Sequence, residues 1–150
     1  KRFAEAAAHE EGFYDETRGD KPDVPKRANN PCDLTDDGDI GNGEIQTAGP
    51  NGAKITIYSN VTDGWAAAFR KFRRMLSGAS HAYTLEMTVE QVGMKFSGDP
   101  NWGKNVATRL GVVGALTVTP NTTLAEIAQA DKQAQEEKAQ DGTGNGGLVQ

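Results

Sequence analysis

One segment, residues 62–76, constrains the fold of this chain more than any other. Its large apolar side chains recur at spacings of four, three and four residues, at Trp65, Phe69, Phe72 and Leu76. This spacing places them on one face of an α-helix, with basic residues on the other faces. A helix with such a face must pack against other elements, so we expect a helical core built around residues 62–76.

Composition limits what can surround this helix. The chain has 150 residues, enough for one domain with a buried core, and its 18 glycines predict many turns and loops. The net charge of −5 argues against a nucleic-acid partner. No stretch approaches the roughly 18 apolar residues that a membrane span needs. The single cysteine, Cys32, excludes an intrachain disulfide framework.

The N-terminal segment, residues 2–13, predicts a helix that ends in acid. It is rich in Ala and Glu, which favour helices, and Gly12 supplies a natural stop. Glu10 and Glu11 therefore lie where the helix ends. Residues 14–43, by contrast, are rich in Pro, Asp, Asn and Gly, which is typical of a loop.

A small β-hairpin and two shorter helices are expected farther along the chain. Strands at 44–48 and 53–58 flank an Asn-Gly pair, a strong hairpin signal. Residues 88–94 and 101–110 carry apolar side chains at helical spacing.

The C-terminal part is expected to be separate from the main domain, which we place at residues 1–120. Thr123 and Glu126 form the Thr-x-x-Glu pattern of a capping box, which opens a helix within residues 121–140. Residues 141–150 are glycine-rich, which favours a flexible tail.

Glu11 is the strongest candidate for acid–base chemistry. A carboxyl group at a helix end, next to apolar Phe13, can keep its proton through desolvation, as a general acid at neutral pH requires. The alternative is that Glu10 and Glu11 are solvated helix residues, because charged side chains are mostly exposed. Position alone favours this alternative.

Several short motifs follow one another in order along residues 3–113. They read AHEEGF at 8–13, RANNPCDL at 27–34, ITIY at 55–58, DGW at 63–65, and SGD, NW, NVA and LGV between 97 and 112. Their order and spacing resemble a lysozyme-like family, the transglycosylase-type peptidoglycan hydrolases of phage virions and bacteria. The resemblance implies a mainly α (α+β) domain of lysozyme-like fold with a small β-hairpin lobe.

The same resemblance implies roles for individual residues. Glu11 matches the family's catalytic acid. Asn29 and Asn30 match the loop that lines the sugar cleft, and Tyr58 matches a position after the hairpin that faces the same cleft. Trp102, at the start of a helix, is interpreted either as a sugar-stacking residue or as a core residue.

The implied reaction is cleavage of the peptidoglycan glycan strand between N-acetylmuramic acid and N-acetylglucosamine, with Glu11 as general acid and base. In lytic transglycosylation the muramic acid's own 6-hydroxyl closes the ring, so no second carboxylate is needed. Hydrolysis needs one at roughly 5 to 9.5 Å, and Asp33 and Asp39 are the nearest candidates. Neither a cofactor nor a metal is expected, and the implied location is extracellular, periplasmic or virion-associated.

One departure leaves a second function open. The family usually has glycine where this chain has Cys32, and a cysteine would be strained there if the position has a positive φ. The alternative is therefore a non-catalytic structural or glycan-binding protein that keeps the fold, such as a virion tail component, with a homo-oligomeric or virion assembly left open.

Residues 33–44 partly match a Ca²⁺-binding loop. The pattern places Asp33, Thr35, Asp37, Gly38, Ile40 and Glu44 at positions 1, 3, 5, 6, 8 and 12 of a twelve-residue loop. Thr35 departs from that pattern and the flanks do not predict two helices, so we interpret the segment as an acidic turn. A Ca²⁺-stabilised adhesion module is the weaker alternative.

The remaining candidates are interpreted as structural. His9 and His81 have no partner at metal-ligand spacing and are expected at helix ends or on the surface. Trp65 is expected in the core, and the basic cluster at 70–74 is expected on the solvated face of its helix.

Overall fold

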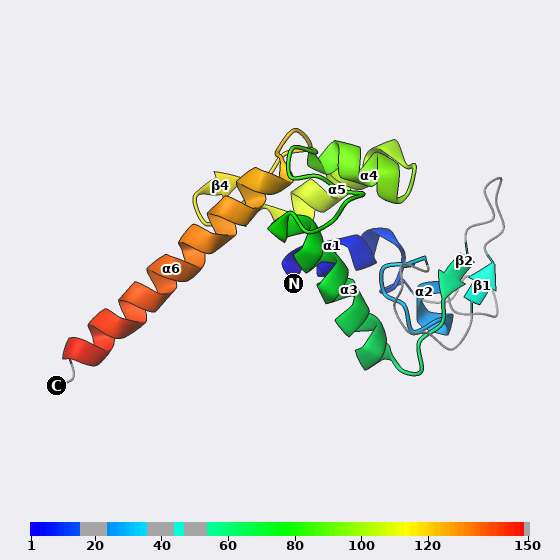
Figure 1. The fold of residues 1–150 in the computed structure, drawn as a ribbon, viewed down its shortest axis with the longest axis horizontal. Coiled ribbons are helices and arrows are strands. Elements are labelled where there is room, and N and C mark those ends of the chain that lie inside the picture. The colour runs from blue at the N-terminus through cyan, green and yellow to red at the C-terminus, as the bar shows by residue number, and fades with distance from the viewer. Residues whose placement is uncertain (16–23, 36–43, 47–53, 149–150) are drawn as a thin grey trace. The chain divides into compact units, whose positions relative to one another are not determined.

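The computed structural model describes residues 1–15, 24–35, 44–46 and 54–148, and it is mainly helical with two small antiparallel sheets (Figure 1). Contacts divide the chain into two compact units, Lys1–Arg73 and Arg74–Gln150, whereas the sequence predicted one domain over residues 1–120. The division falls inside a continuous helix, where no change in composition marks it. No helix in the described part of the chain is long and apolar enough to cross a membrane.

Two of the three helices that lie wholly or mostly in the first unit carry closely packed small side chains. The helix α1 spans Arg2–Glu10, and Ala4, Ala7 and Ala8 on it are 0% exposed. The long helix α3 spans Val61–Ser77, which confirms the predicted helix at 62–76. The Phe3 ring stacks on that of Phe72, with centroids 5.0 Å apart. Because alanine side chains are short, the backbone of α1 is held close to its neighbours.

The predicted hairpin is confirmed by β1, Glu44–Gln46, and β2, Lys54–Thr56. They pair antiparallel with Ile45 opposite Ile55, while the expected turn lies outside the described residues. The helix α2, Val24–Arg27, lies where only loop was expected. Pro25 does not prevent it, because a first helical turn needs no N–H donor at that position.

In the second unit, α4 and α5 lie side by side (Figure 1). They span Val89–Phe96 and Pro100–Leu110, which confirms the two shorter predicted helices. The helices meet at glycines: a Cβ on Gly103 would lie 2.6 Å from the Glu90 Cα, and one on Gly93 would lie 2.9 Å from the Gly103 nitrogen. Glycine at both positions therefore allows the two backbones to approach.

A second hairpin and a long helix complete this unit. The strands β3, Val112–Val113, and β4, Leu116–Thr117, were not predicted, because two-residue strands leave no alternating pattern. Their two-residue connection begins with Gly114 at φ +59°, a conformation that favours glycine.

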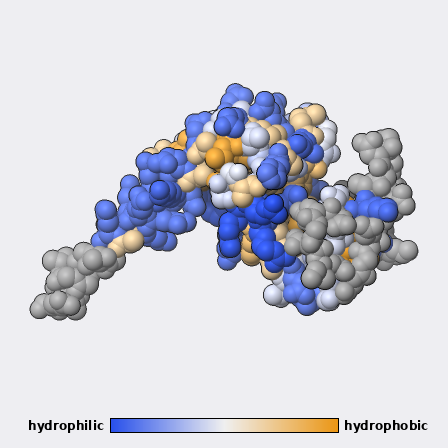
Figure 2. Space-filling view, viewed as in Figure 1, coloured by the Kyte–Doolittle hydropathy of each residue, from blue (hydrophilic) through white to orange (hydrophobic). Residues whose placement is uncertain are grey.

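The helix α6 spans Leu124–Leu148 and begins at the predicted capping box. The Glu126 N–H donates to Thr123 Oγ1 and the Thr123 N–H donates to Glu126 Oε1, both at 3.2 Å. Leu124, Ile127 and Ala130 are buried, whereas most side chains from residue 131 to 141 are exposed. Figure 2 shows the surface of this helix as mostly hydrophilic. The helix also continues through most of the segment expected to be a flexible tail.

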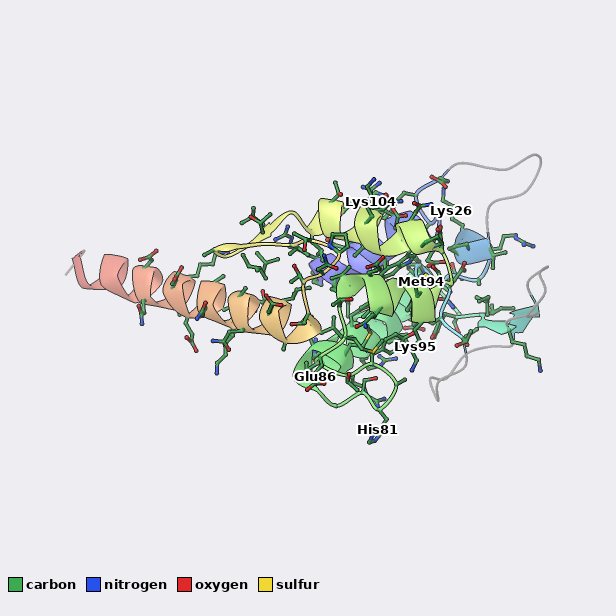
Figure 3. The ribbon with its side chains drawn as sticks, turned by 90° about the horizontal axis from the view of Figure 1, so that it is seen from above. Lys26, His81, Glu86, Met94, Lys95 and Lys104 are labelled. Atoms are coloured by element: carbon green, nitrogen blue, oxygen red, sulfur yellow. The ribbon has the colours of Figure 1, made fainter. Side chains whose placement is uncertain are left out.

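We predict that Gly103→Ala destabilises the chain by about 1–3 kcal/mol, a typical effect of overpacking. In a helix without this contact, the same change would stabilise by about 1 kcal/mol, so the sign is informative. Thermal and urea unfolding would measure it. Lys104→Ala is the control, because Lys104 is exposed on the same helix (Figure 3) and should change stability by no more than about 0.5 kcal/mol. A stabilised Gly103→Ala variant would contradict the close approach of α4 and α5.

Candidate functional site

Glu11 lies at a well-defined helix end. It caps α1 with φ −80° and ψ −3°, and its backbone N–H donates to the Ala7 carbonyl at 3.0 Å. Gly12 follows at φ +85°, and its N–H donates to the His9 carbonyl at 3.2 Å. The Phe13 N–H donates to the Ala8 carbonyl at 3.0 Å. This is the hydrogen-bond pattern of a Schellman motif, which explains the sequence Glu-Gly-Phe. The half-buried Glu11 side chain is thus attached to a fixed backbone.

Glu11 and Asp33 both act electrostatically on the buried thiol of Cys32. Cys32 is 0% exposed and its Sγ donates to the Ala4 carbonyl at 3.3 Å. Burial raises the pKa of the thiol far above its ordinary value, and the negative charges of Glu11 and then Asp33 raise it further. Both carboxylates therefore lie within electrostatic reach of the same sulfur atom.

Asn30 holds the loop that carries Cys32 and Asp33. It is 0% exposed, and its Nδ2 donates to the carbonyls of Leu34 and Thr56, each at 2.9 Å. Its Oδ1 accepts the Leu34 N–H at 2.9 Å. One side chain thus closes the loop on itself and joins it to β2. The sequence assigned Asn30 to substrate binding, but a fully buried amide engaged in this way has a structural role instead.

The concern about strain at Cys32 is resolved by the backbone. Among the described non-glycine residues, the positive φ angles are those of Asn29, at 51°, and Asp33, at 50°. Asn and Asp tolerate this region better than most residues, so the loop turns at its neighbours rather than at Cys32. Gly64 of α3 allows the loop to sit close, because a Cβ there would lie 1.7 Å from the Asn29 carbonyl oxygen.

The other predicted substrate-binding residues are less accessible than expected. Tyr58 is 3% exposed, and its backbone oxygen accepts the Asn29 Nδ2 at 3.0 Å. Trp102 is 2% exposed and its ring lies 5.3 Å from that of Phe96, so of its two interpretations the core role is confirmed. Asn29 is half-buried. These side chains support the architecture and offer little surface to a ligand.

A run of aromatic rings beside Glu11 was not predicted. The His9 ring stacks on the Tyr14 ring, with centroids 4.0 Å apart. The Phe13 ring makes T-shaped contacts with Tyr14 and Trp65, with centroid distances of 5.2 Å and 5.4 Å. The Trp65 ring in turn stacks on Phe69 at 5.5 Å. Trp65 was expected in the core but is half-buried. The one sequence signal was the aromatic pair Phe13-Tyr14 directly after the helix end.

The structure brings no metal ligands together in the part that it describes. No group of three or more His, Cys, Asp or Glu side chains there could hold an ion. Most of the calcium-type pattern, together with the candidate carboxylate Asp39, lies outside the described residues. His81 is exposed and projects away from the ribbon (Figure 3).

We predict that the Cys32 thiol is unreactive in the folded protein and makes stability fall at alkaline pH. Because its pKa is higher in the folded state than its ordinary value of 9.0, the unfolded chain loses the proton first. Its contribution is complete below about pH 9 and falls by about 1.4 kcal/mol per pH unit above it.

Urea unfolding between about pH 9 and pH 10 tests this, with Cys32→Ala as the control that removes the slope. In the same range, a thiol reagent such as Ellman's reagent should label the unfolded chain at least about 100-fold faster than the folded one, because the thiolate is the nucleophile. Equal labelling rates would contradict the buried position of the thiol.

A scan of protein-family models, a search of curated proteins and a search of solved structures each found no match for this chain. The lysozyme-like resemblance therefore stays a prediction from the sequence motifs, and we infer a function from the geometry of the helix end at Glu11.

Proposed function

We propose that the chain cleaves the peptidoglycan glycan strand between N-acetylmuramic acid and N-acetylglucosamine, on a lysozyme-like fold, with Glu11 as general acid and base. The observation that carries the proposal is the Schellman motif at the end of α1, which fixes the backbone from which the half-buried Glu11 carboxyl projects. Asp33 lies on the loop next to Cys32, whose thiol is affected by the charges of both Glu11 and Asp33, so Asp33 is the candidate for the second carboxyl group that a hydrolase needs.

The first chemical step needs only Glu11. The protonated carboxyl donates to the glycosidic oxygen as the bond to the muramic acid C1 breaks, and positive charge develops on that sugar as an oxocarbenium-like centre. The Schellman motif supports this role, because it fixes the backbone from which the carboxyl projects. A positioned acid of this kind accelerates such a step by about 10²–10⁴-fold.

The second step has two routes. In transglycosylation, the 6-hydroxyl of the muramic acid attacks C1 and gives its proton to the ionised Glu11, which restores the acid. In hydrolysis, a second carboxylate either activates water or attacks C1, and Asp33 is the candidate whose surroundings favour it. The loop that Asn30 holds in place carries Asp33, so the hydrolytic route depends on that loop keeping its shape.

The partner of the chain, under this proposal, is the glycan strand of the cell wall, met outside the cell, in the periplasm or from a virion. The direct test incubates purified protein with isolated sacculi and measures soluble muropeptides. Release that requires Glu11 supports the proposal. Binding to sacculi without any release would instead favour a non-catalytic glycan-binding protein.

A further inference from the structure

We propose that the aromatic run His9, Phe13, Tyr14, Trp65 and Phe69 is a carbohydrate-binding platform, on which Tyr14 stacks against a sugar ring of the bound glycan strand. This inference rests on the proposed function, since it names the surface that would hold the strand beside Glu11. All five rings belong to the first unit.

The exposure of Tyr14 is the first reason. Four large apolar side chains are exposed in the described part of the chain: Tyr14, Val61, Met94 and Val112. Tyr14 is the aromatic one among them, and 47% of it is exposed. Large aromatic rings are usually buried in a core unless they serve an interface, where one end is apolar and the other is wet.

The rings also hold one another in place. His9 covers one side of the Tyr14 ring, at 4.0 Å and an interplanar angle of 24°. Phe13 meets Tyr14 at 85° and Trp65 at 81°, so it contacts both rings in a T-shaped arrangement. A ring already fixed by its neighbours loses little conformational freedom when a ligand binds, which favours affinity.

The chemistry of the run suits a sugar better than a peptide. The faces of a pyranose carry C–H groups, which pack against the electron-rich face of an aromatic ring, while its edges carry hydroxyl groups that need polar partners. Tyr14 supplies such a partner in its own hydroxyl, whose pKa is raised by burial first and then by the negative charge of Glu5. The platform thus combines an apolar face with a polar edge.

The spacing of the rings favours a strand over a single sugar. The centroids of Tyr14 and Trp65 lie 6.4 Å apart with planes tilted by 43°, so the two rings are distinct surfaces side by side. Phe13 follows Glu11 by two residues along the chain, so the platform adjoins the end of α1 that carries the acid. An oligomer should therefore bind more tightly than a monosaccharide.

The test measures binding of chitotetraose, a β-1,4-linked tetramer of N-acetylglucosamine, to the Glu11→Gln variant by calorimetry and by Trp fluorescence. Tyr14→Ala in this background should weaken binding about tenfold, the effect of losing one aromatic stacking contact. Tyr14→Phe, which keeps the ring and loses only the hydroxyl, should weaken binding by about threefold, clearly less than Tyr14→Ala does. Val61→Ala is the matched control, since Val61 is exposed in the same unit and should leave affinity unchanged.

Circular dichroism melts would verify that Tyr14→Ala folds, as expected for an exposed side chain outside a helix. Absence of chitotetraose binding, or equal affinity of folded Tyr14→Ala and its parent, would overturn the inference. Because the Glu11→Gln background removes turnover, these outcomes are separate from the proposed reaction. Tyr14-dependent binding by a chain that releases no muropeptides would uphold the platform and overturn the proposed cleavage.

Discussion

Replacing Glu11 by glutamine should reduce the release of soluble muropeptides from isolated sacculi by at least about 100-fold, the lower end of what a positioned general acid contributes. Glutamine has nearly the same size but cannot donate the proton that the leaving oxygen needs. The helix end should persist, because the substitution leaves the hydrogen bond from the Glu11 backbone N–H to the Ala7 carbonyl in place. The measurement is the initial rate of release at several protein concentrations, together with a thermal melt of both proteins.

Glu10→Gln is the matched control for this prediction. Glu10 is the neighbouring acid, also half-buried, and it is the last residue of α1. Its charge does not enter the reaction that we propose, so activity should stay within about twofold of the original, a change of less than 0.5 kcal/mol in the barrier. Equal losses in the two variants would mean that acidity at the helix end, rather than Glu11 itself, is what matters.

Replacing Asn30 by alanine should destabilise the protein by about 3 kcal/mol. The change removes three hydrogen bonds from a fully buried position and leaves backbone groups of Leu34 and Thr56 with fewer partners, and a buried group without one costs about 1–3 kcal/mol. Urea unfolding would measure the loss. In the hydrolytic route muropeptide release should fall as well, because the same loop carries Asp33.

Asn60→Ala is the control with which the loss of stability in the Asn30 variant is compared. Asn60 is exposed and caps α3, where its Oδ1 accepts the Asp63 N–H at 2.9 Å. Loss of such a cap costs about 1 kcal/mol, so this variant should be clearly milder. If the two asparagine variants were equally stable, Asn30 would not be the residue that holds the loop.

The parts of the fold that were predicted from sequence are those with strong local signals. The spacing of Phe69 and Phe72 predicted α3, and the Thr123 and Glu126 pair predicted the start of α6, because each signal lies within a few residues. The helix α2 was missed because its four residues include Pro25, which reads as a loop signal. Short elements depend on tertiary contacts that no local pattern reveals.

The candidate site shows the same limit. Glu11 could be singled out because the sequence predicts a helix end at this position. The burial of Asn30 and Tyr58 could not be predicted, since polar residue types usually indicate the surface. The aromatic run joins rings from α1, the turn after it, and α3. Only the fold brings His9 and Tyr14 onto the same surface as Trp65.

Mass spectrometry of a sacculus digest would show whether the chain cuts the glycan strand and whether Glu11 is needed for the cut. We expect soluble disaccharide-peptides whose glycan bond is cut and whose peptide is intact, and we expect these products to disappear with Glu11→Gln. A 1,6-anhydro end on the muramic acid would identify transglycosylation, and a reducing end would identify hydrolysis. Sacculi that yield no soluble glycan product, or products that persist unchanged in the Glu11→Gln digest, would contradict glycan cleavage by Glu11.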